Sequence, residues 1–359
     1  MSTPAALVRR AAAGAAVALL CALSSATTGI PTSRAAGADL LAAAIANTRG
    51  SYLVYNFGGG FPAPMLAADG HAYEMNNGGH LMIIKAASSR IAPRLLTDSH
   101  SGHQARCERD PRARTSEGLP QASEVYAPVT AWQVLGKPTI AINANFFDVR
   151  GQKGGSWKST GCSSPLGAYV DNTNGMGKTN AAVTGTIPYA GKQGLSGGNE
   201  TWTPLSTMII PVSGQPFMVT PKAGSDFDAA GPVVVGLMNK GVRFVAVSGI
   251  GLLSPDDTGQ LRDNGPSAAR TALAYNRGKD EMYVFQGGSY TPDQIQDLFR
   301  AMGSDTALLL DGGGSSAIVL RRDTGGMWAG AGVPKGSCDT VQVLCDSRER
   351  ALPSWLAFN

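Results

Sequence analysis

Short apolar runs, separated by stretches rich in glycine, proline and polar residues, recur along most of this chain and predict β-strands. Two of these runs, 269–276 and 281–286, flank the polar segment 277–280 and predict a β-hairpin. The same pattern predicts strands at 52–57, 81–85, 138–148, 166–170, 206–212, 243–249, 307–311 and 317–320. We therefore expect more strand than helix.

One stretch, 291–303, shows a clear helical pattern. Thr291 is placed to cap the helix, Pro292 suits its first turn, and Gln294 completes a capping box. Apolar side chains then recur at the spacing of one helix face, at Ile295, Leu298, Phe299 and Met302. This stretch is the clearest helix in the chain.

The other helical signals are weak. Residues 38–50 indicate a short helix, and 123–136 a helix broken by Pro128, whereas 98–122 is expected to be a long surface loop. Glycine supplies 46 of the 359 residues, about twice its average share, which favours tight turns. We expect an α+β fold with a mixed, twisted β-sheet core, few helices and long glycine-rich loops.

The N-terminus has the character of an export signal. Arg9 and Arg10 precede an apolar run at 11–23 that is too short to span a bilayer, and small residues at 36–38 suit a cleavage site. We expect residues 1–38 to be removed and the mature protein to be secreted. No later apolar run reaches the length of a membrane span.

The mature chain is expected to be one domain, with an N-terminal part at 39–137 and a core at 138–359, because no repeat or linker separates them. Without residues 1–38 the chain has 27 basic and 26 acidic residues, since three arginines are lost. This balance provides no general basic field for nucleic acid. The oligomeric state stays open.

Four cysteines remain in the mature chain, and an even number in an exported protein indicates two disulfides. Three pairings are possible. Proximity favours Cys338 with Cys345, which leaves Cys107 with Cys162. The close spacing typical of zinc ligands is absent from the sequence, so no metal or other cofactor is expected.

The run Asp-Gly-Gly-Gly-Ser-Ser at 311–316 lies between two apolar runs. A tight glycine turn is the plain interpretation. Three adjacent glycines, however, let a ligand approach the main chain, where successive N–H groups can bind an anion. The run lacks the lysine of a Walker loop, the helix of a dinucleotide site and the Gly-x-Ser-x-Gly of a hydrolase elbow. The candidate residues are Asp311, Gly312, Gly313, Gly314 and Ser315.

Two other stretches carry candidate ligands. Arg270 opens an apolar strand beside Thr271, and a guanidinium can grip phosphate or carboxylate with two hydrogen bonds. A structural ion pair is the alternative. Asn143 and Asn145 end another strand before Phe146. Their amides suit sugar hydroxyls and the ring suits a sugar face, whereas turn capping and core packing are the alternative.

Three stretches, 142–148, 269–275 and 284–320, occur in an order that resembles the phosphodiester glycosidase family, and the resemblance extends over about 138–322. It implies hydrolysis of a sugar-1-phosphodiester at the glycosidic bond, with Asp311 and Arg270 as catalytic residues. The residues expected to bind the substrate are Asn143, Asn145, Phe146, Thr271, Gly312, Gly313, Gly314 and Ser315.

The expected substrate is a cell-wall or exopolysaccharide glycan that carries a glycosyl phosphate. A second carboxylate would come from Asp148 or Asp263. Two other classes stay open: a non-catalytic protein that binds an anionic glycan on the same scaffold, and a metal-dependent phosphodiesterase. A Ser-His-Asp triad requires the stretch with all four histidines, at 71, 80, 100 and 103, to fold back on the site.

Overall fold

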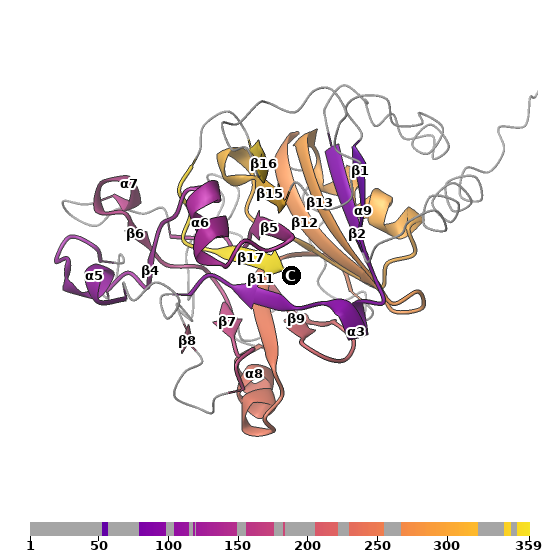
Figure 1. Cartoon of the computed structure of the whole chain (residues 1–359), viewed down its shortest axis with the longest axis horizontal. Helices are drawn as coiled ribbons and strands as arrows, with labels where there is room; N and C mark the ends of the chain where they lie inside the picture. Colours follow the sequence, from indigo (N-terminus) through magenta and orange to yellow (C-terminus); the bar gives the residue numbers. More distant parts are fainter. Residues whose placement is uncertain are drawn as a thin grey trace, which may run out of the picture. The chain divides into compact units, whose positions relative to one another are not determined.

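Two antiparallel β-sheets share one hydrophobic core in the computed structural model of this protein (Figure 1). The structure describes residues 52–56, 79–97, 104–114, 118, 120–148, 156–175, 182–183, 205–221, 230–254, 267–321, 341–345 and 350–359. The described residues all belong to one unit of the chain, Thr32–Asn359.

Ten described strands form the larger sheet, in the order β1 (Tyr52–Asn56), β2 (Gly79–Lys85), β13 (Glu281–Tyr290), β12 (Ala268–Asn276), β14 (Thr306–Leu309), β11 (Phe244–Leu253), β7 (Val170–Asp171) and β8 (Ala182–Val183), with β9 (Ser206–Pro211) on β11 and β10 (Phe217–Val219) on β9. The predicted hairpin is confirmed, because β12 and β13 pair from Arg270 with Gly287 to Asn276 with Glu281. The strand predicted at 166–170 is shorter than expected and is reduced to β7.

Five described strands form the smaller sheet, in the order β16 (Val341–Cys345), β15 (Ala317–Arg321), β5 (Ile140–Asn143), β17 (Trp355–Phe358) and β3 (Pro93–Leu95). All four pairs are antiparallel. A two-stranded sheet of β4 (Ser123–Glu124) and β6 (Cys162–Ser163) lies outside both.

Within the described ranges, the helices are few: α3 (Ala87–Arg90), α5 (Gln104–Arg109), α6 (Pro128–Val134), α7 (Trp157–Thr160), α8 (Ala230–Asn239) and α9 (Pro292–Ala301). The expected α+β class is therefore confirmed. No helix in these ranges combines the length and the apolar character needed to cross a membrane.

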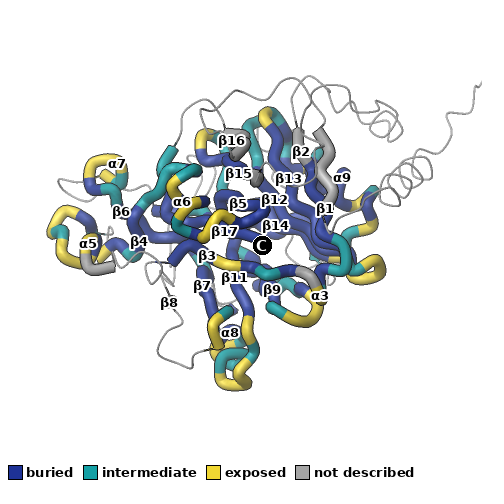
Figure 2. Tube along the Cα trace, viewed as in Figure 1, coloured by how far each residue is buried: buried dark blue, intermediate teal, exposed yellow. Residues whose placement is uncertain are grey.

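Alternate residues of a strand face opposite sides of its sheet, and this divides the apolar side chains between layers. Met82 of β2 and Ile142 of β5 lie in the core between the two sheets. Ile83 faces the opposite side, where it packs with α9, and Ala141 packs with α6 on the outer side of the smaller sheet. The central strands are buried along their length (Figure 2).

Local signals explain which helix predictions succeeded. α9 is confirmed, and Thr291 and Gln294 form both hydrogen bonds of the capping box. The broken helix at 123–136 is wrong, because Pro128 begins α6 at a position where an N–H has no helical partner to lose. Residues 98–122 are not one loop, since they contain α5. The helix expected at 38–50 lies outside the described residues.

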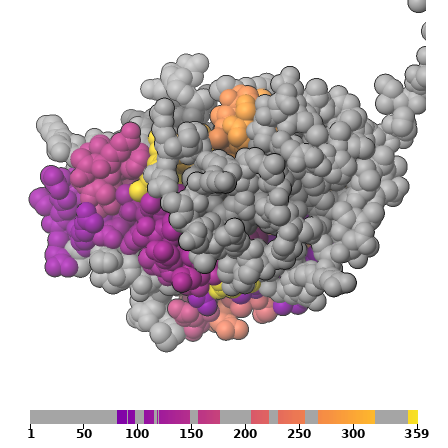
Figure 3. Space-filling model, turned by 45° about the horizontal axis from the view of Figure 1, so that its top comes forward, coloured from indigo at the N-terminus to yellow at the C-terminus, as the bar shows by residue number. Residues whose placement is uncertain are grey.

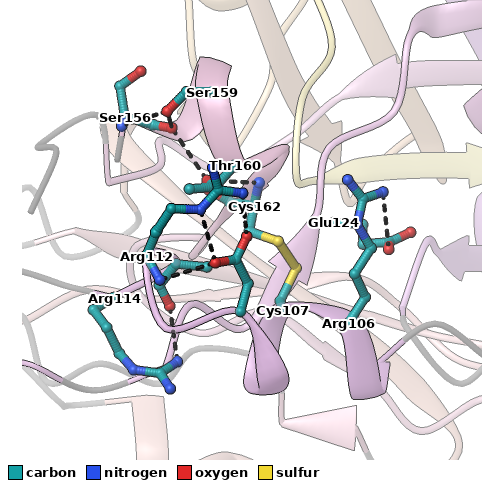
Figure 4. Close-up of polar contacts among 11 residues, drawn as sticks. Arg106, Cys107, Arg112, Arg114, Glu124, Ser156, Ser159, Thr160 and Cys162 are labelled. Carbon is teal, nitrogen blue, oxygen red and sulfur yellow. Dashed lines mark hydrogen bonds and ion pairs between the residues drawn. A yellow bond between two sulfur atoms is a disulfide. The ribbon is translucent and has the colours of Figure 1, made fainter. Parts of the chain in front are cut away.

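A disulfide joins Cys107 of α5 to Cys162 of β6, as expected (Figure 4). Both cysteines are buried and lie in a small cluster with Ala113. On the face drawn in Figure 3, described residues from α5 to β6, coloured purple to pink, lie near one another on the surface. The second expected pair includes Cys338, which lies outside the described residues.

Candidate active site

The glycine-rich run at 311–316 carries the chain from the larger sheet to the smaller one, since β14 belongs to the first and β15 to the second. The N–H of Leu310 donates to the carbonyl oxygen of Thr271 on β12 at 2.9 Å. The N–H of Asp311 donates to the carbonyl oxygen of Ala144, just after β5, at 3.0 Å. The run, called the crossing segment below, is therefore bonded to both sheets and does not close a hairpin.

Asn143, the last residue of β5, fixes the crossing segment through its side-chain amide. Its Nδ2 donates to the carbonyl oxygen of Asp311 at 2.7 Å. Its Oδ1 accepts from the Thr271 hydroxyl at 2.6 Å and from the N–H of Ala317 at 2.9 Å. Asn143, Thr271 and Ala317 are all buried, so removing the Asn143 amide would leave the Thr271 hydroxyl and the Ala317 N–H without this acceptor. The amide thus holds both sheets around Asp311.

Glycine is required at two positions of the crossing segment. A Cβ at Gly312 would lie 2.9 Å from the carbonyl oxygen of Ala269 and 3.5 Å from a guanidinium nitrogen of Arg270. Gly313 has φ +62°, which side chains disfavour. The Nε of Arg270 donates to the carbonyl oxygen of Tyr290 at 3.3 Å, which holds the guanidinium beside this backbone.

The N–H groups of the three glycines are used differently. That of Gly312 donates to the Asp311 carboxylate at 2.9 Å. The N–H groups of Gly313 and Gly314 have no hydrogen-bond partner within the part of the chain that the structure describes. Since Gly314 is exposed and Gly313 partly exposed, both groups could donate to an anion.

Asp311 is partly buried, and burial raises the pKa of its carboxyl group to about 6. Hydrogen bonds from the Ser315 hydroxyl and the Gly312 N–H oppose this rise, as do the positive charges of Arg350 and Arg270. The carboxyl group therefore changes its charge close to neutral pH. Such a pKa suits an acid or base in catalysis.

Arg350 is a neighbour of this carboxyl group that the sequence patterns do not single out. Its Nη1 donates to the Ser315 hydroxyl at 3.0 Å, and a Cβ at Gly314 would lie 3.5 Å from its Cζ. It follows the charged stretch Asp-Ser-Arg-Glu at 346–349, and one more arginine after such a stretch forms no motif in the sequence. Only the folded chain, which brings residues 315 and 350 together, reveals it.

Three of the expected substrate ligands use their side chains in contacts within the fold. Asn145 donates to the carbonyl oxygens of Leu166 at 2.8 Å and Ala168 at 3.0 Å. Thr271 is fully buried and gives its hydroxyl proton to Asn143. Phe146 is partly buried and packs against the cluster that contains α9. These contacts suit positioning roles, and direct substrate binding by these residues stays a prediction.

The second carboxylate remains a prediction. Asp148 is buried, and its main chain is bonded to Ser163 and Ser164 on the side of β6. Asp263 lies outside the described residues, as do His71, His100 and His103. Among the residues that are described, no three His, Cys, Asp or Glu side chains come together as a metal site.

Guanidinium groups can bind a phosphate, and a carboxyl group with a pKa near neutral pH can act as an acid or a base. The family model for phosphodiester glycosidase matches residues 136–358, and the chain belongs to this family. The protein is thus a hydrolase of the phosphodiester glycosidase type, and the family implies a glycan substrate. No curated protein sequence matches the chain.

Solved structures similar to the chain include three from different organisms. A zebrafish N-acetylglucosamine-1-phosphodiester alpha-N-acetylglucosaminidase catalytic domain, auto-inhibited by its pro-peptide, has 15% identity and a TM-score of 0.48, with 87% of this chain and 85% of that chain covered. A hypothetical protein from Synechocystis has 16% identity and a TM-score of 0.37, with 79% and 59% covered. A putative exported protein from Burkholderia pseudomallei has 12% identity and a TM-score of 0.38, with 90% and 88% covered.

Proposed function

We propose that this protein hydrolyses a sugar-1-phosphodiester at its glycosidic bond and releases a free sugar and a phosphate monoester. The family supports glycosidase activity on a phosphodiester. The observation that carries the proposal is the position of Asp311 beside Arg270 on a backbone segment tied to both sheets. A carboxyl group and a guanidinium group that can bind a phosphate therefore lie close together, which supports the proposal.

The leaving group in this reaction is a phosphate monoester, whose second pKa is about 6. It can depart as an anion without a strong proton donor. The bond between the anomeric carbon and the bridging oxygen breaks, and its electron pair stays on the phosphate. Arg270 and the N–H groups of Gly313 and Gly314 would stabilise that charge.

The anomeric carbon becomes positively charged as the bond breaks. An ionised Asp311, the first residue of the crossing segment, would stabilise this charge. A water molecule then supplies its oxygen to the carbon and gives up one proton. The carboxylate can accept that proton, directly or after a covalent step, so the released sugar is neutral. Asp311 then passes the proton to the departing methyl phosphate or to solvent, which restores the carboxylate.

We further propose that the protein is exported and acts on a cell-wall or exopolysaccharide glycan. The predicted signal at 1–38 supports export. The disulfide between Cys107 and Cys162 also supports it, because such bonds persist mainly in oxidising compartments.

The decisive experiment identifies the products formed from a panel of methyl diesters of sugar-1-phosphates. Free sugar and methyl phosphate support the proposal. Sugar-1-phosphate and methanol, formed in a chelator-sensitive reaction, would support the metal-dependent phosphodiesterase class. Binding without products would support a glycan-binding protein.

Asp311→Asn tests the role of the carboxyl group in the same assay. The amide keeps the shape and cannot carry the negative charge, so we expect turnover to fall at least about 10³-fold. Asp293→Asn, on the exposed first turn of α9, is the matched control and should retain full activity. Full activity of Asp311→Asn would remove Asp311 from the mechanism.

A further inference from the structure

Arg350 approaches the crossing segment with the flat side of its guanidinium group. A Cβ at Gly314 would lie 3.5 Å from Cζ and 3.7 Å from each Nη, so the three atoms are almost equally distant from that point. Nη1 donates to the Ser315 hydroxyl at 3.0 Å. A guanidinium group has five N–H donors. Ser315 is its one hydrogen-bond partner among the described residues, so other donors remain for a ligand.

Trp157 provides a second contact that fixes Arg350. The Cζ of Arg350 lies over the Trp157 ring, 5.3 Å from its centroid. Such a cation–π contact stabilises one orientation of the guanidinium plane. Phe147 is buried and meets the Trp157 ring edge to face, with the ring centroids 5.3 Å apart. The core therefore supports the ring, and the ring supports the arginine.

The short helix that carries Trp157 is itself anchored at both ends. Ser156 and Ser159 form a capping box at the start of α7 (Figure 4). Two residues after α7 ends, Cys162 is bonded to Cys107 of α5. A four-residue helix is not stable alone, so these anchors determine where the Trp157 ring lies.

We propose that Arg350 is a second cation that binds the phosphate group of the substrate and that Trp157 is its positioning residue. The inference deepens the proposed function and rests on it, because it assigns the ligand of the same site. Arg270 would hold the phosphate near Gly312, and Arg350 would hold it near Gly314. Two guanidinium groups suit a phosphate that keeps a negative charge before and after bond cleavage.

Binding of methyl phosphate, measured by titration calorimetry on the purified protein, tests the inference without requiring turnover. Arg350→Lys keeps the positive charge and loses the planar guanidinium group with its paired N–H donors. Trp157→Leu removes the ring, and Trp157→Phe keeps an aromatic face. Lys158→Gln is the matched control, because Lys158 is exposed and lies 5.6 Å from the same ring centroid. Circular dichroism and thermal unfolding show whether each variant folds.

We expect Arg350→Lys and Trp157→Leu each to weaken methyl phosphate binding about tenfold or more, the effect of about 1.4 kcal/mol. Trp157→Phe should stay within about threefold of the natural protein, because phenylalanine also supports a cation. Lys158→Gln should bind normally. Normal binding in Trp157→Phe together with weak binding in Trp157→Leu would show that an aromatic ring is needed to position Arg350. A general packing effect would not distinguish the two variants in this way.

Unchanged binding in folded Arg350→Lys, or no binding of methyl phosphate by the natural protein, would overturn the inference. Normal binding in Trp157→Leu would overturn the positioning role. If binding depends on Arg350 and Trp157 but no sugar-1-phosphodiester is cleaved, phosphate binding by Arg350 is supported and the proposed hydrolysis fails. If the sugar-1-phosphodiester is cleaved but methyl phosphate binding does not depend on Arg350, the proposed function stands and the inference fails.

Discussion

Asp311 has its carboxylate turned toward its own segment, where it accepts the Gly312 N–H at 2.9 Å and is bonded by the Ser315 hydroxyl. These contacts favour the ionised form, whereas burial disfavours it and is the larger effect. The chemistry of this one residue therefore depends on pH in the range where most enzymes work.

The rate should depend on the ionised form of Asp311. The pKa of Asp311 is raised to about 6, so we expect kcat/KM for a methyl sugar-1-phosphodiester to fall as pH drops below about 6. The phosphodiester itself keeps its charge over this range. A pH–rate profile checks this. A rate that increases as pH falls below 6 would instead assign Asp311 the role of proton donor.

Asp311 should also reduce the stability of the fold at neutral pH. Its folded pKa of about 6 exceeds the ordinary value of 3.8, so the folded chain binds this proton more tightly. The stabilising effect of the proton is complete below about pH 4 and is lost as pH rises through about 6. We expect Asp311→Asn to raise the free energy of unfolding by about 1 kcal/mol at pH 7, a value reduced for partial solvent exposure. Urea unfolding at pH 4 and 7 measures this, and an equal gain at both values would contradict it.

Residue types at the site could be predicted from the sequence, but their partners could not. Amides suit sugar hydroxyls, which makes Asn143 a candidate substrate ligand in the sequence. In the structure, however, its hydrogen bonds go to Thr271, Asp311 and Ala317, more than 120 residues away in the chain. Arg350 gave no signal at all. Hydrogen-bond partners that arrive from distant elements are set by the fold and leave no local pattern.

At the scale of the element, predictability follows how local the stabilising contacts are. α9 could be predicted because its cap, its first proline and its apolar face all lie within one stretch. α5 could not, because six residues make a marginal helix and the bond from Cys107 to Cys162 supports it. The local sequence does not predict a short element that is stabilised by a distant partner.

Loss of the disulfide should therefore destabilise the chain measurably. The bond closes a loop with a sequence separation of 55 residues, and replacing Cys107 and Cys162 by serine should lower the free energy of unfolding by about 3 kcal/mol. Methyl phosphate binding should weaken with it, because α7 carries Trp157. Thermal unfolding and calorimetry measure the two effects. Unchanged stability in the double variant would show that α5 and β6 are held by other contacts.

At the scale of the whole molecule, strands were easier to predict than their pairing. The hairpin of β12 and β13 is local and was expected, whereas the passage from β14 in one sheet to β15 in the other was not. A run of apolar residues shows that a strand is buried and does not show which sheet it joins. The order of strands depends on contacts across the whole chain.

Because the Asn143 amide and the crossing segment bond to both sheets, the site should not survive separation of the sheets. We expect heat inactivation and the calorimetric unfolding transition to coincide within a few degrees. Asn143→Ala should shift both together, since it leaves buried polar groups without partners. An inactive state that keeps its full unfolding enthalpy would contradict this coupling.

The short passage between β14 and β15 also limits how relatives of this protein can diversify. Its main chain is hydrogen-bonded to Thr271 and to Ala144, and a Cβ at Gly312 would lie 2.9 Å from the Ala269 carbonyl oxygen. Insertions there would move the Asp311 carboxyl group relative to Arg270 and Arg350. We therefore expect relatives to differ in length mainly in the stretches around this passage and rarely within it.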